Sequence, residues 1–105
     1  MVKISLYTMI ENVEPEEFIE RLTNVIEKLG YSYIVDESWV QVMVLLGYGM
    51  AVFDIEKVFK DGKPYLNVNI LPIGTLATLS SLITDIQKLL KEMGIDYKKL
   101  GFIVK

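Results

Sequence analysis

Residues 66–84, LNVNILPIGTLATLSSLIT, contain no charged residue, in a chain of 105 residues of which 24% are charged. The first part alternates apolar residues with two asparagines, which predicts a half-buried strand over residues 65–71. After the break at residues 72–74 the apolar spacing becomes helical, so we expect a helix from Thr75 to a glycine cap at Gly94. The proline, the glycine and the polar residues exclude a membrane-spanning helix here.

The N-terminal part of the chain has the same order of patterns. Alternation over residues 2–7 predicts a strand, and an amphipathic helix should begin at Pro15 and end at Gly30. The segment IEKLGYSY at 26–33 also resembles LKEMGIDY at 90–97. The two patterns predict two βαβ halves, residues 1–37 and 64–105.

Residues 39–59 lie between these halves and are rich in valine. Residues 39–46 favour a strand, although the capping-box pattern at Ser38 and Gln41 leaves a short helix open. The following strand should return through a tight turn at Asp61-Gly62, a strong hairpin signal. We therefore expect residues 39–59 to form an inserted β-hairpin.

These elements resemble the ferredoxin-like architecture. We expect a single α+β domain over residues 1–105, a ferredoxin-like split βαβ sandwich with an inserted hairpin and both helices on one face of a mainly antiparallel sheet. This resemblance concerns architecture alone, and no functional residue follows from it.

The composition excludes several kinds of chemistry. The chain has no cysteine and no histidine, which removes thiolate and histidine catalysis and the commonest zinc ligands. We predict no catalytic residue, no cofactor and no metal site, because Asp54 and Glu56 on one strand face are too few ligands. The net charge of -3 argues against a dedicated nucleic-acid binder.

The sheet face away from the helices is a candidate binding surface. If the first strands of the two halves lie side by side, six polar residues meet there: Lys3, Ser5, Tyr7, Tyr65, Asn67 and Asn69. They could hold a small polar ligand, or simply form a solvated face. An alternative is a small hydrolase or isomerase that uses this face, and another is a single-stranded RNA binder that stacks bases on the two tyrosines.

A second candidate surface belongs to residues 39–46. Val40, Val42, Val44 and Leu46 would occupy one face of this strand, and Trp39, Met43 and Leu45 the other. Helices on one side of a sheet can bury only one of these faces, so we predict that the second set forms an interface with another copy, most simply in a dimer. The expected protein is a non-enzymatic cytoplasmic module that binds itself, and also a ligand or another protein.

Overall fold

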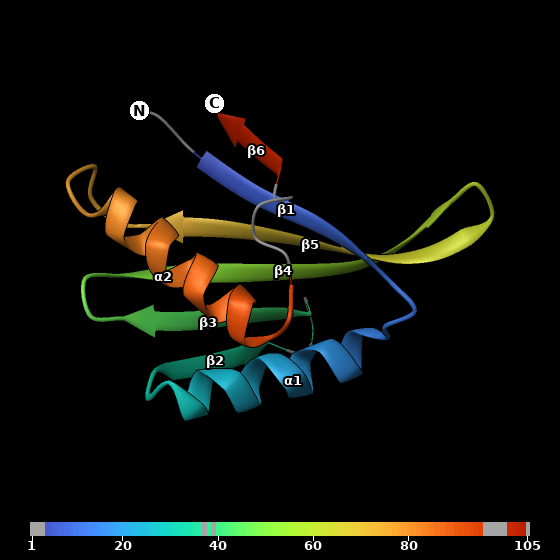
Figure 1. Cartoon of the computed structure of the whole chain (residues 1–105), viewed down its shortest axis with the longest axis horizontal. Helices are drawn as coiled ribbons and strands as arrows, with labels where there is room; N and C mark the ends of the chain where they lie inside the picture. The colour runs from blue at the N-terminus through green and yellow to red at the C-terminus, as the bar shows by residue number, and fades with distance from the viewer. Residues whose placement is uncertain (1–3, 37, 39, 96–100, 105) are drawn as a thin grey trace.

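A six-stranded antiparallel sheet carries two helices on one of its faces (Figure 1). The computed structural model describes residues 4–36, 38, 40–95 and 101–104. The sheet has the strand order β2-β3-β4-β5-β1-β6. In chain order the elements are β1 (Ile4–Glu11), α1 (Pro15–Lys28), β2 (Ser32–Asp36), β3 (Gln41–Leu46), β4 (Gly49–Lys60), β5 (Lys63–Ile73), α2 (Leu79–Glu92) and β6 (Gly101–Val104).

Both helices end as the sequence predicts. The glycines after them have left-handed backbones, with φ of 82° at Gly30 and 78° at Gly94. Beyond the first glycine, the Tyr31 amide donates to the Ile26 carbonyl at 3.1 Å, and an equivalent 2.9 Å bond follows the second. A backbone hydrogen bond across a left-handed glycine ends each helix, and glycine adopts this conformation without strain.

The start of α2 differs from the prediction. The helix begins at Leu79, and residues 75–78 form a separate turn in which Thr78 donates its backbone amide and its hydroxyl to the Thr75 carbonyl. Thr75 is therefore not the N-cap, and the predicted helix start there is wrong. The threonine hydroxyl satisfies the backbone locally, which favours a turn over a longer helix.

The core lies between the helices and the sheet. Alternate residues of β3, β4 and β5 point into it, and Val42, Phe53 and Ile70 are fully buried. Residues 41–46 form a strand, so the strand prediction is confirmed and the short helix is excluded. Of this strand, Val42, Val44 and Leu46 face the core, as expected. Neither described helix is long and apolar enough to cross a membrane.

The β4–β5 hairpin projects beyond the helices as an arm, which we define as residues 57–66 (Figure 1). Asp61 and Gly62 have φ of 53° and 76°, which confirms the predicted turn. At the base of the arm Lys57 forms a 3.0 Å ion pair with Glu14, next to the start of α1.

The ferredoxin-like prediction is wrong. Five antiparallel strands have the order β1-β5-β4-β3-β2, and the chain runs β-α-β-β-β-β-α before β6. The strands that flank α1 are separated by three others instead of belonging to a compact βαβ half. The hairpin of β3 and β4 is not an appendage, because its residues Val44, Ala51 and Phe53 supply buried core. Because these apolar side chains are stabilised by burial, β3 and β4 lie inside the sheet and not at its edge.

Candidate functional site

The sheet face opposite the helices, here called the open face, is the candidate site. Cross-strand pairing places side chains on it in rows. One row runs across five strands as Asp36, Gln41, Asp54, Asn69 and Tyr7. We call these five residues the polar row.

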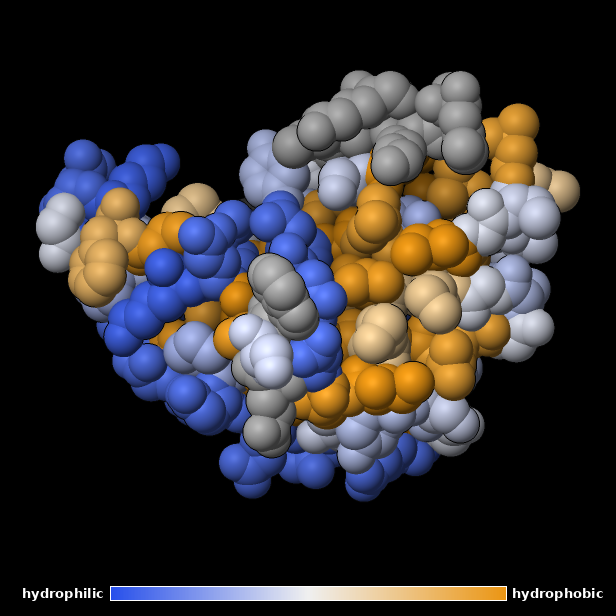
Figure 2. Space-filling view, turned by 180° about the vertical axis from the view of Figure 1, so that it is seen from behind, coloured by the Kyte–Doolittle hydropathy of each residue, from blue (hydrophilic) through white to orange (hydrophobic). Residues whose placement is uncertain are grey.

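An apolar patch lies beside the polar row, over the end of the sheet away from the arm (Figure 2). Its members come from four neighbouring strands: Ile34, Met43, Leu45, Met50, Val52, Leu71 and Ile73. Ile34 is 54% exposed, Ile73 44% and Leu45 41%. Among the described residues no element covers this surface, and a contiguous exposed apolar patch is a candidate site of contact with a partner.

The predicted interface residues can be placed in part. Met43 and Leu45 both lie in the apolar patch, on the same strand. Trp39 lies outside the described residues. The five remaining patch residues, which β2, β4 and β5 supply, were not predicted. Alternation on β4 and β5 was the available signal, because Met50, Val52, Leu71 and Ile73 are apolar at positions opposite to the core-facing residues.

The predicted polar cluster is brought together only partly. β1 and β5 are neighbours, and they place Tyr7 opposite Asn69. Asn67 faces Met9 and Tyr65 faces Glu11, so other residues interrupt the cluster. Ser5 lies on the same face but pairs with β6, and Lys3 lies outside the described residues. Among the described residues, no side-chain hydrogen bond joins members of this cluster, and its ligand binding stays a prediction.

Tyr7 has a close neighbour that the sequence analysis did not identify. Gly101 of β6 pairs with Tyr7, and a β-carbon at Gly101 would overlap the tyrosine ring. The ring therefore lies over the bare backbone of this glycine. An aromatic side chain that covers a glycine on a neighbouring strand fills the space left by the missing side chain.

The open face has an acidic character. Glu11, Asp54 and Glu56 are exposed on it, and Asp36 is half-buried. The described basic residues on this side of the sheet, Lys60 and Lys63, lie at the tip of the arm, and none of the four carboxylates forms an ion pair with a described residue. No group of three or more acidic side chains within the described residues could hold a metal ion. The face therefore combines an apolar patch with uncompensated negative charge.

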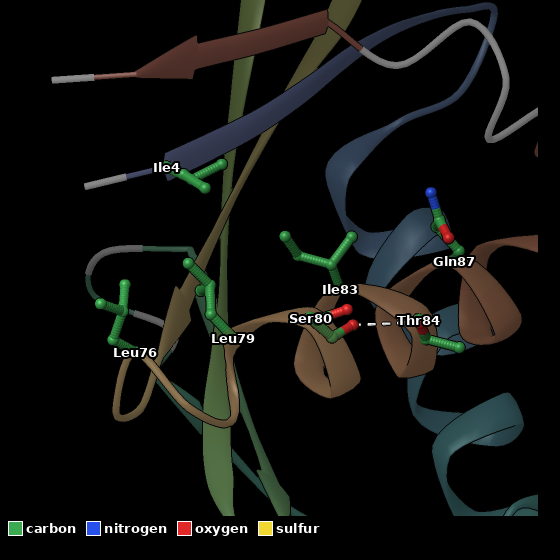
Figure 3. Close-up of a pocket in the computed structure, with 7 residues that line it drawn as sticks. All are labelled: Ile4, Leu76, Leu79, Ser80, Ile83, Thr84 and Gln87. Carbon is green, nitrogen blue, oxygen red and sulfur yellow. Dashed lines mark hydrogen bonds between the residues drawn. The ribbon is translucent and has the colours of Figure 1, made fainter. Parts of the chain in front are cut away.

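A shallow hollow of about 480 Å³ lies on the other side of the molecule, between α2 and β1 (Figure 3). Its lining is apolar at Ile4, Leu76, Leu79 and Ile83, and carries the uncharged polar residues Ser80, Thr84 and Gln87. None of these side chains is a practical general acid or base at neutral pH. The hollow therefore offers contact surface rather than acid–base catalysis.

Tyr48 links the β3–β4 turn to α2 by a hydrogen bond. Its hydroxyl donates to the carboxylate of Asp85, and this hydrogen bond is the main cause that raises the pKa of Tyr48 to about 12. Partial desolvation raises the pKa of Tyr31, and the charge of Asp85 adds to the effect. Both shifts move the pKa of a phenol further above physiological pH, so neither tyrosine is prepared to act as a base.

Comparison of the sequence with protein-family models and with curated proteins finds no match.

Proposed function

We propose that the protein is a non-enzymatic interaction module that associates with other copies of itself through the apolar patch of the open face. The observation that supports this proposal is the exposure of large apolar side chains on four adjacent strands, with Ile34 at 54% and Leu45 at 41%. Burying such side chains against a partner is favourable by about 25 cal/mol per Å² of apolar area. A second copy of the chain is the simplest partner, because most soluble oligomers are built from identical chains.

Two neighbouring lysine substitutions test this proposal. Val44→Lys places a charge in the fully buried face of β3, whereas Leu45→Lys places it in the patch, where the residue is already 41% exposed. Val44→Lys should destabilise the fold by several kcal/mol, because an unpaired charge is buried. Leu45→Lys should keep the thermal transition near that of the wild type and lower the mass measured by sedimentation.

Leu76→Lys is the matched control. Leu76 is 80% exposed, but it belongs to the hollow beside α2 and not to the patch. This substitution should leave both the mass and the thermal transition unchanged. A wild-type protein that sediments as a monomer at all concentrations up to the millimolar range would refute the proposal of self-association.

A further inference from the structure

The apolar patch alone is too small for a stable contact between two identical faces. It is four strands wide and two same-face positions long, which corresponds to about 19 Å by about 13 Å. That is roughly 250 Å² on each copy, against the ~800 Å² per partner of a standard interface. A larger overlap of two open faces would have to include the polar row.

Charge also opposes a face-to-face contact. Asp54 follows Val52 of the patch along β4 and points to the same side of the sheet, and Glu56 is the next residue on that side. A two-fold contact that extends beyond the patch brings these carboxylates and their copies into one interface. Like charges that lose water in this way oppose association. The open face therefore needs a partner surface that is narrow, apolar and positively charged.

The tip of the arm has these properties. Phe59 is 72% exposed, and Lys60 pairs directly with Lys63 across the hairpin. Like charges opposite each other in a ladder are unfavourable, and among the described residues neither lysine has an ion-pair partner that would relieve the repulsion. A two-stranded ribbon is about 10 Å wide, which fits within the patch.

We propose that the arm tip of one copy docks on the open face of a second copy, with Phe59 on the apolar patch and Lys60 and Lys63 near Asp54 and Glu56. This inference rests on the proposed function and specifies its geometry. Phe59 faces the side of the ribbon opposite to the two lysines, but a lysine stem is long and flexible enough to bring its ammonium group around the ribbon edge. The contact relieves like-charge repulsion on both surfaces at once.

This geometry makes the contact heterologous. The arm and the patch lie at opposite ends of the sheet (Figures 1 and 2). Each copy therefore keeps a free arm or a free patch after one contact forms, so further copies can add head to tail. A two-fold contact between patches would instead stop at a dimer.

A complementation experiment separates the two arrangements. The arm variant carries Lys60→Glu and Lys63→Glu, and the face variant carries Leu45→Lys, with Ile34→Lys as a second face variant if the first is unstable. Each variant alone should sediment as a monomer. Mixed in equal amounts, they should form a species of twice the monomer mass and nothing larger, because the mixture offers only one intact arm–face pair. Raised salt should weaken the contact, since exposed charges contribute to it.

The control for net charge is Lys88→Glu with Lys91→Glu, two exposed lysines of α2 that lie away from both surfaces. It should associate as the wild type does. If the arm variant alone still associates while the face variants do not, arm docking is wrong and self-association through the patch stands. If the wild type itself never associates, the proposed function and this inference both fail.

Discussion

At the scale of single residues, two glycines close the helices through backbone conformation alone. A β-carbon at Gly30 or at Gly94 would meet no atom within 4 Å, so any cost of adding one comes from the positive φ. We expect Gly30→Ala and Gly94→Ala each to lower the free energy of unfolding by about 1 kcal/mol, and Gly94→Val to lower it further. Denaturant titration measures this.

The control for the helix caps is Gly47→Ala. Gly47 also has open space around it, but its φ is outside the left-handed region. The free energy of unfolding should change little. If the free energy of unfolding fell equally in all three glycine variants, the left-handed conformation of the caps would not be the cause of the destabilisation.

Gly101 provides a second prediction about a single residue, because its missing side chain is what makes room for the ring of Tyr7. Gly101→Ala should destabilise the wild type by roughly 1–3 kcal/mol, the usual cost of overpacking. In a Tyr7→Ala background the same substitution should cost much less. Denaturant titration of the four proteins in this cycle gives the coupling. If the two substitutions change the free energy of unfolding additively, the position of the tyrosine ring does not depend on the missing side chain at Gly101.

At the scale of elements, the Tyr48–Asp85 hydrogen bond joins the β3–β4 turn to α2 and makes stability depend on alkaline pH. The bond raises the pKa of Tyr48 from 10.0 to about 12 in the folded protein. Its contribution is therefore complete below pH 10 and is lost as the pH rises towards 12. Tyr48→Phe should lower the melting temperature at neutral pH and flatten its decline over this alkaline range.

Tyr65→Phe serves as the comparison, because Tyr65 has no side-chain hydrogen bond to a described residue and lies on the open face. Its melting temperature should follow that of the wild type across the same range of pH. A decline in Tyr48→Phe as steep as in the wild type would assign the alkaline loss to other groups.

Individual elements were predictable where one local signal was sufficient. Asp61-Gly62 specified its turn, and Gly30 and Gly94 specified helix ends, because each requires a positive φ that few residues adopt cheaply. The start of α2 was not predictable from spacing, since Thr75 and Thr78 are equally good capping residues and a local hydroxyl bond decided between them. Nothing in the sequence indicated the positive φ of 52° at Val40, because β-branched residues avoid that region of backbone conformation.

At the scale of the whole molecule, the arrangement of strands was the part that the sequence could not specify. The similar patterns before Gly30 and Gly94 suggested two equivalent halves, yet similar helices can join very different strand orders. The adjacency of β1 and β5 did follow the prediction, whereas the register that pairs Tyr7 with Asn69 was not predicted. The polar row and most of the patch required the register of β3 against β4, which no single strand reveals.

Stability should not depend on metal ions, because the neighbours of Asp54 and Glu56 across the strands are amides, and among the described residues no third carboxylate lies close enough to share a metal ion with them. Treatment with a chelator should leave the melting temperature unchanged. A fall of several degrees that added Ca²⁺ or Mg²⁺ reverses would instead identify a cation site on the open face. Asp54→Asn would then be expected to remove the effect of the cation.

The connections within the sheet have a consequence for the order in which the protein folds. β2, β3, β4 and β5 follow one another through short turns, so their contacts close small loops. β1, in contrast, must find β5 from far along the chain, pairing Leu6 with Ile70, and this closure costs more entropy. The meander should therefore form first and β1 should join late. In native-state hydrogen exchange, the amides that join β3 to β4 should outlast those that join β1 to β5.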